Sequence, residues 1–205
     1  MTSPYPPYDR FFLRCCAVLA FTGYAAIILA NIAGSIIVPG HDPMADTISD
    51  LGAGRYEIIQ DLGFYGYAAG LMALSMALAN LHPGGMRWTT GLFAVAIVAA
   101  LTIVIGARNE YGDNDSDGVV IHIYLVYGLA LLIGIAPFAL RDGVRHWGES
   151  YARISVVFGI VWWVAAPVFF FMPTGWDGAW ERGLGVAATA WFTLITVGVW
   201  READR

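Results

Sequence analysis

The stretch CCAVLAFTGYAAIILANIAGSIIV, residues 15–38, decides the fold. It contains no Asp, Glu, Lys, Arg or His. About 20 apolar residues in a helix are enough to span the ~30 Å hydrocarbon core of a bilayer. This stretch therefore predicts a transmembrane helix.

Five further stretches repeat the pattern along the chain. The six predicted spans are residues 15–38, 62–80, 88–107, 118–140, 154–176 and 183–200. The chain of 205 residues is 58% hydrophobic and only 13% charged, whereas soluble domains are about a quarter charged. Strands are not indicated, because the stretches are too long and do not alternate. The sequence predicts an all-α fold, a polytopic transmembrane bundle of six helices forming one domain over residues 1–205.

Arginine placement predicts the orientation, because cytoplasmic loops carry an excess of Arg and Lys. One side of the bundle carries Arg10, Arg14, Arg87, Arg141, Arg145, Arg153, Arg201 and Arg205. The other side carries Arg55, Arg108 and Arg182. We therefore expect a multi-pass protein of the cell membrane with both termini in the cytoplasm. The net charge of −5 gives no basis for nucleic-acid binding, which needs a basic surface.

The segment after the first span has the pattern of a short extracytoplasmic amphipathic helix. Asp42 before Pro43 is typical of a helix start, and Gly52 of a helix end. Apolar residues share one face of this helix, and Asp46, Ser49 and Asp50 fall on the opposite face with Asp42. If the polar face meets water, the pattern is ordinary. If it faces the mouth of the bundle, it predicts a cation or metal site.

The loop before the fourth span is strongly acidic. Asp113, Asp115 and Asp117 alternate as in the opening of a calcium loop, whose carboxylates wrap the ion. The Glu that such loops need at position twelve is replaced by Tyr124. The same residues also fit an acidic turn that caps the fourth span, and both interpretations stay open.

His122 is the only ionisable residue of the Asp, Glu, Lys, Arg and His types within a predicted span. An ionisable group at membrane depth indicates a functional site. The alternative is a neutral imidazole that is hydrogen-bonded to a neighbouring helix. His41 lies at the mouth of the first span on the same side, so the two histidines are expected near each other.

Two motifs resemble a known family. TISDLG follows the first span at residues 47–52, and DGVVIH opens the fourth at residues 117–122. Their order and placement resemble the bacterial and archaeal integral-membrane proteins of domain of unknown function 998. The resemblance implies six or more spans and a shared site, but no activity. It carries over to Ile48, Ser49, Asp50, Leu51, Gly52, Asp117, Gly118 and His122.

These patterns give a set of candidate site residues at the outer face. The candidate ligand-binding residues are Ser49, Asp50, Asp46, Asp117 and His122. The candidate metal ligands are His41, His122, Asp50, Asp113, Asp115 and Asp117. Zinc or calcium would be the metal, whereas bis-histidine haem is not indicated because only one His lies within a span.

Three classes of function remain open from the sequence. The first is a non-catalytic accessory, lipid-binding or small-ligand-binding protein whose functional region lies at the outer face. The second is a metal-dependent membrane hydrolase or transferase that uses His41, Asp50 and His122. The third is a small transporter. In each case the partners expected are the bilayer and either another membrane protein or further copies of the chain.

Overall fold

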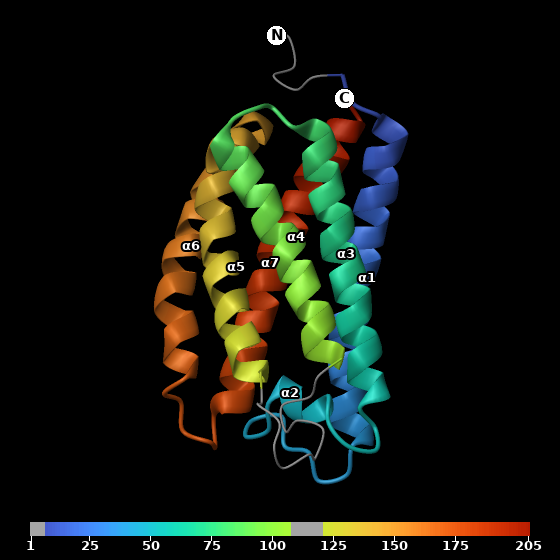
Figure 1. Cartoon of the computed structure of the whole chain (residues 1–205), viewed down its shortest axis with the longest axis vertical. Helices are drawn as coiled ribbons and strands as arrows, with labels where there is room; N and C mark the ends of the chain where they lie inside the picture. Colours follow the sequence, from blue (N-terminus) through green and yellow to red (C-terminus); the bar gives the residue numbers. More distant parts are fainter. Residues whose placement is uncertain (1–6, 108–120) are drawn as a thin grey trace.

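The computed structural model describes residues 7–107 and 121–205, and all regular structure in them is helical. The α-helices are α1 (Arg10–Ile37), α2 (Ile48–Leu51), α3 (Ile58–Leu81), α4 (Met86–Ala107), α5 (His122–Val144), α6 (Glu149–Phe169) and α7 (Asp177–Ala203), and a 3₁₀ turn, η1 (Arg145–Trp147), joins α5 to α6. The predicted all-α fold is confirmed. The long helices run side by side, with α2 at one end of the bundle (Figure 1).

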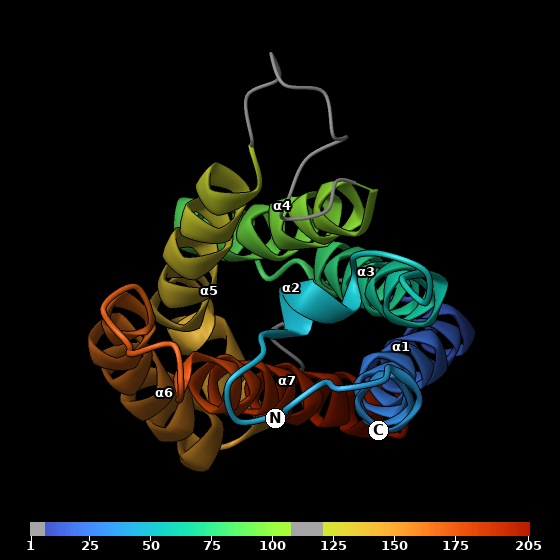
Figure 2. The ribbon, with the colours of Figure 1, turned by 90° about the horizontal axis from the view of Figure 1, so that it is seen from below.

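The six long helices form a ring. Each packs against the next in chain order, and α7 closes the ring by packing against α1. Viewed along the helices, α2 lies within the ring (Figure 2). We call this end of the bundle the α2 end and the opposite one the terminal end. The terminal end brings the first and last helices together, and Tyr8 Oη donates a 2.8 Å hydrogen bond to Glu202 Oε1 there.

All six long helices are long and apolar enough to cross a membrane. Large apolar side chains are exposed around the ring, among them Leu29, Leu62, Phe93, Val157 and Val164. A soluble monomer rarely exposes so much contiguous apolar surface. The chain is therefore a multi-pass membrane protein.

Some helix bounds differ from those of the predicted spans. α7 begins at Asp177, six residues before the predicted span, because an acid in the first turn stabilises a helix start. α6 ends at Phe169, seven residues before the predicted end of the fifth span at Trp176. Pro173 disfavours helical geometry in the residue before it, which separates α6 from α7.

The amphipathic helix after the first span is shorter than its pattern predicted. α2 contains only four residues and begins after Thr47, whose side chain accepts from Asp50 N while the Asp50 carboxylate accepts from Thr47 N. Asp42 does not start this helix. It closes a separate turn, in which its backbone carbonyl accepts from Asp46 N at 2.7 Å. The reciprocal capping box at Thr47 starts the helix afresh.

Small residues let α1 and α3 approach closely. A Cβ added to Gly23 would collide with the Gly66 carbonyl oxygen, and one added to Gly66 would lie 2.8 Å from Ala26 Cβ. Small residues of the two helices therefore form the contact between them. Such contacts hold membrane helices together through close van der Waals packing.

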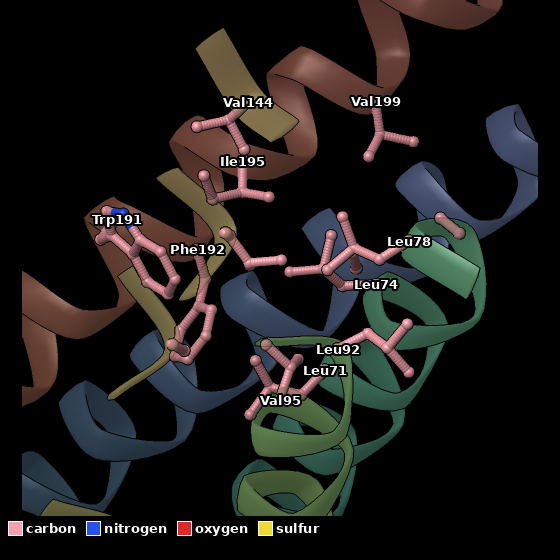
Figure 3. Packing of buried hydrophobic residues seen from close by; sticks show 14 of the residues in the cluster. Leu71, Leu74, Leu78, Leu92, Val95, Val144, Trp191, Phe192, Ile195 and Val199 are labelled. Atoms are coloured by element: carbon pink, nitrogen blue, oxygen red, sulfur yellow. The ribbon is translucent and has the colours of Figure 1, made fainter. Parts of the chain in front are cut away.

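The interior of the ring is filled at the terminal end. The core cluster there includes Leu71, Leu74, Leu78, Val95, Phe192, Ile195 and Val199, each at most 1% exposed, and Figure 3 shows these side chains meeting between the helices. On α3 and α7 these residues come from the halves that lead to the terminal end. Close packing here seals that side of the ring, and any interior space lies toward α2.

Candidate functional site

A cavity of about 400 Å³ lies inside the α2 half of the ring. All six long helices and α2 contribute to its wall, and most of the lining is apolar. The lining residues include Ile27, Ile48, Phe64, Tyr67, Val98, Thr102, Ile105, Leu129, Ile133, Trp162, Gly185, Ala188 and Thr189. A volume of this size, with a few polar groups on an apolar wall, is typical of small-molecule sites.

The cavity opens sideways between α1 and α7. Ile28, Ile32 and Val186 line it, yet they are 45%, 53% and 64% exposed on the outside of the bundle. These exposed apolar side chains belong to two helices that are long and apolar enough to cross a membrane. The cavity thus opens on the apolar flank of the bundle.

α2 covers the cavity at its end of the ring. Ile48 lines the cavity, while Leu51 is 1% exposed and would touch a Cβ added to Gly34 of α1 at 3.1 Å. On the other side of α2, Ser49 Oγ and His122 Nε2 are 3.0 Å apart and share a hydrogen bond. His122 is 6% exposed at the start of α5. The structure thus brings together two of the residues that the sequence singled out, one on the cap and one on the ring.

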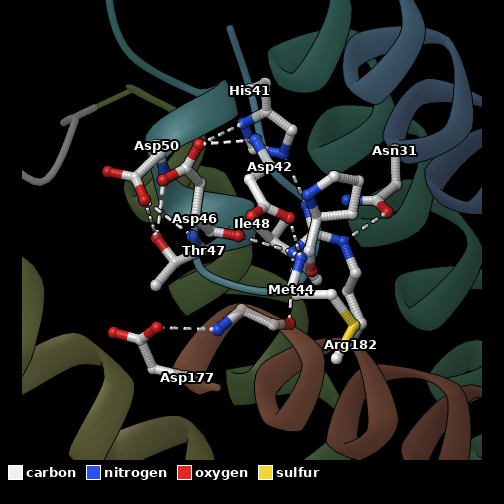
Figure 4. A network of polar contacts seen from close by, with 12 residues as sticks. Asn31, His41, Asp42, Met44, Asp46, Thr47, Ile48, Asp50, Asp177 and Arg182 are labelled. Atoms are coloured by element: carbon white, nitrogen blue, oxygen red, sulfur yellow. Dashed lines mark hydrogen bonds and ion pairs between the residues drawn. The ribbon is translucent and has the colours of Figure 1, made fainter. Parts of the chain in front are cut away.

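Arg182 ties the segment before α2 to α7 (Figure 4). Its Nη1 donates to the carbonyl oxygens of Pro43, Asp46 and Gly178, at 3.0, 2.6 and 3.1 Å. The approach is close enough that a Cβ added to Gly178 would collide with the Asp46 carbonyl. Only glycine at this position lets the segment rest directly on α7.

His41 lies between Arg182 and Asp46. Its Nε2 accepts from Arg182 Nη2 at 2.8 Å, so Nδ1 carries the proton and faces the Asp46 carboxylate at 3.5 Å. The side chain is only 3% exposed. Burial and the Arg182 charge lower the pKa of His41 from its ordinary value, against the opposing effect of Asp46, Asp50 and Asp42. His41 is therefore neutral at pH 7 and acts as an acceptor for Arg182.

The predicted ligand residues Asp46 and Asp50 both serve the local backbone. Asp46 Oδ2 accepts from Asp42 N at 2.7 Å. Asp50 Oδ2 accepts from Thr47 N at 2.6 Å and from Thr47 Oγ1 at 2.9 Å. Glu181, from α7, accepts from Ile48 N at 2.5 Å. These acids hold the cap in place, and ligand binding by Asp46 or Asp50 stays a prediction.

The predicted metal site has no support among the described residues. In residues 7–107 and 121–205, no group of three or more His, Cys, Asp or Glu side chains is placed to hold a metal ion. His41 and His122 instead have the hydrogen-bond partners given above. Asp113, Asp115 and Asp117 lie outside the described residues. The predicted calcium loop and the predicted ligand-binding role of Asp117 are therefore untested.

Three polar residues near the cavity were not singled out from the sequence. Asn31 and Arg182 line the cavity, and Arg182 Nε donates to Asn31 Oδ1 at 3.2 Å. Gln60 is fully buried on α3, one and two turns before the lining residues Phe64 and Tyr67 on the same helical face. Within the described part of the chain, Asn31 Nδ2 and both amide atoms of Gln60 have no partner. For Asn31, an amide within the apolar stretch 15–38 was the signal in the sequence.

Comparison with known proteins gives the family. A protein-family model described as "Protein of unknown function (DUF998)" matches residues 18–198, which run from within α1 to within α7. No curated protein and no solved structure matches the chain. This family was predicted from the motifs TISDLG and DGVVIH. Ser49 of the first motif and His122 of the second share a hydrogen bond in the structure. Because the match covers most of its length, this multi-pass membrane protein belongs to the DUF998 family.

Proposed function

We propose that this protein binds a small amphipathic molecule in the cavity at the α2 end, and that it takes the molecule from the bilayer. The observation that carries the proposal is the cavity itself, about 400 Å³ of mainly apolar space inside a ring whose terminal end is densely packed. Membrane proteins fill their interiors closely, so an empty volume of this size needs an occupant.

The surroundings of the cavity favour binding without a chemical step. The polar side chains on its wall are Asn31, Arg182, Tyr67, Thr102 and Thr189. Tyr67 and Thr189 are hydrogen-bonded to each other at 3.2 Å, and Thr102 donates to Val98 O at 2.8 Å. Among the described residues, this wall offers no nucleophile paired with a general base, and its remaining polar groups suit recognition.

Arginine placement supports an outward-facing site. The excess of Arg at the terminal end favours the cytoplasm for that end, which assigns the α2 end to the outer face of the cell membrane. The protein would then hold its ligand in the outer leaflet half of the bilayer, beneath the cap formed by α2.

A cavity-filling substitution tests the proposal. A Cβ added to Gly185 would meet only Ile48 Cδ1, at 3.8 Å, so Gly185→Leu puts a side chain into the cavity without a backbone collision. Gly183→Leu is the matched control, since Gly183 lies on the same helix outside this cavity and has nothing within 4 Å of its added Cβ.

The measurement is saturable binding of tritiated hexadecanol to the full chain in phosphatidylcholine nanodiscs, with empty nanodiscs as the blank. We expect the wild type and Gly183→Leu to bind alike and Gly185→Leu to bind at least tenfold more weakly. No saturable binding by the wild type, or equal binding by all three proteins, would overturn the proposal.

A further inference from the structure

Asn31 presents two unused N–H donors at the cavity wall. Its Oδ1 accepts from Arg182 Nε at 3.2 Å, which fixes the orientation of the amide. Its Nδ2 is buried and has no partner within the described residues. A buried donor without an acceptor costs free energy, and such groups are rare in folded proteins. A ligand with an acceptor oxygen at this point would satisfy it.

Arg182 adds a positive charge beside the same donors. Its contacts are the carbonyl oxygens of Pro43, Asp46 and Gly178, Asn31 Oδ1 and His41 Nε2, all of them neutral acceptors. No carboxylate of the described residues lies within ion-pair distance of it. A guanidinium has five N–H groups, and Nη2 makes a single contact here, which leaves one N–H for a ligand.

From this juxtaposition, and resting on the function proposed above, we propose the chemical class of the ligand. It is a single-chain amphiphile with an acidic head group, a carboxylate or a phosphate, whose oxygens accept from Asn31 Nδ2 and Arg182 Nη2. Its chain lies along the apolar wall and leaves through the opening lined by Ile28, Ile32 and Val186. Hydrogen bonds between a cation and an anionic oxygen are the stronger kind, and here they form away from water.

The acids at the α2 end act in the opposite direction, because their field favours a cationic head group. Several of them are already held by backbone N–H groups: Asp42 by Met44 N, Asp46 by Asp42 N, Asp50 by Thr47 N, Asp177 by Gly178 N and Glu181 by Ile48 N. Of all these charged groups only Arg182 belongs to the cavity wall. A comparison of acidic and amine head groups therefore decides whether Arg182 or the surrounding acids determine the head group that binds.

The experiment compares head groups on one chain length in the nanodiscs described above. Palmitate and hexadecyl phosphate represent the two acidic head groups, hexadecanol the neutral one and hexadecylamine the cationic one. We expect at least one acid to bind about tenfold or more tightly than hexadecanol, the effect of one charge-assisted hydrogen bond. The amine should bind most weakly, and the two acids together show which head group is preferred.

Asn31→Asp is the sharpest variant. It keeps an oxygen for Arg182 Nε and replaces the two unused donors with a second carboxylate oxygen. We expect it to lower the affinity for the acids relative to hexadecanol about tenfold or more. Asn31→Leu removes the donors without adding a charge, and should reduce the preference for palmitate over hexadecanol even if Asn31→Asp does not fold.

The outcomes separate this inference from the function on which it rests. If hexadecanol binds and Gly185→Leu prevents it, but acids bind no better than the alcohol or the amine binds best, the head-group site is wrong and the amphiphile-binding function stands. If the preference for acids persists undiminished in both Asn31 variants, the site is also wrong. If no probe binds the wild type, the function itself fails.

Discussion

The contact between His41 and Arg182 depends on pH. The Arg182 guanidinium donates to His41 Nε2 at 2.8 Å, and this bond requires a neutral imidazole. Burial, then Arg182, lowers the pKa of His41 below the unfolded value of 6.5. Between these two values the unfolded chain binds more protons than the folded one. Stability from this group is therefore full above about pH 6.5 and is lost as pH falls through that window.

We predict that acidification from pH 7.5 to pH 5 lowers the melting temperature partly through His41. Loss of one hydrogen bond is worth about 1 kcal/mol, or roughly 2–4 °C in a protein of this size. Thermal unfolding of the purified protein across this range, compared with His41→Gln, measures the effect. The glutamine oxygen still accepts from Arg182 but does not titrate, so the variant should show a shallower pH dependence. Identical slopes would show that His41 is not the group responsible.

A second hydrogen bond between two side chains, like that of His41 with Arg182, joins Ser49 to His122. It joins the covering helix to the start of α5 at 3.0 Å, with His122 buried. Both residues belong to the motifs on which the family resemblance rests. The two motifs thus meet where α2 contacts α5. Their structural role is to attach α2 to the ring next to the cavity.

α2 is short, and its capping box holds its first turn. Thr47 Oγ1 accepts from Asp50 N at 3.1 Å while Asp50 Oδ2 accepts from Thr47 N at 2.6 Å. A helix of four residues has little stability of its own. Its position therefore depends on this box and on its contacts with α1, α3 and α7.

We predict that Thr47→Ala loosens the cap. Loss of an N-cap side chain costs about 0.5–2 kcal/mol, which corresponds to roughly fivefold faster hydrogen exchange at residues 48–53 if the segment opens locally. Hydrogen–deuterium exchange with peptide mapping measures it. Thr47→Ser keeps the hydroxyl and should exchange like the wild type, and a matching increase in Thr47→Ser would remove the capping explanation.

The α1–α3 contact requires glycine where the two backbones meet. A side chain at Gly23 would meet the Gly66 carbonyl and lie 2.9 Å from Gly70 Cα. Backbone atoms cannot move aside as flexible side chains do, so the helices must separate. Overpacking of this kind typically costs 1–3 kcal/mol.

We predict that Gly23→Leu lowers the melting temperature by several degrees, as expected for about 1–3 kcal/mol. Gly183→Leu serves as the control, because its added side chain meets nothing within 4 Å. Thermal unfolding in the same nanodiscs compares the two. A Gly23→Leu protein that melts with the wild type would show that α1 and α3 do not pack as closely as described.

The whole molecule has two different ends, and its orientation can be measured. We predict that the α2 end faces outward. In a background without Cys15 and Cys16, Arg55→Cys marks the α2 end and Met86→Cys, on a residue 80% exposed, marks the terminal end. A membrane-impermeant maleimide applied to intact cells should label only the first variant. Labelling of only the second would reverse the orientation, and with it the leaflet assigned to the cavity.

Much of the architecture could be predicted from the sequence, because apolar runs such as residues 15–38 report directly on membrane helices. The grouping of Ser49 and His122 in one candidate site came from the motifs TISDLG and DGVVIH, since 73 positions separate these residues along the chain. The extent of α2 was not, because Asp42 and Thr47 both resemble helix caps and only the reciprocal bond to Asp50 decides between them. The cavity wall was missed because Asn31 and Arg182 lie 151 positions apart and meet only when the ring closes.

That closure between α1 and α7 has a consequence for biosynthesis. The first and last spans form one wall of the cavity, and α2 rests on α7 through Gly178 and Arg182. A nascent chain inserted as far as α6 therefore has its earlier membrane helices in order. It still lacks α7, which closes the side of the cavity and supports α2. Ribosome-stalled or truncated chains would expose the cavity interior to lipid, and the cavity is completed only when α7 leaves the translocon.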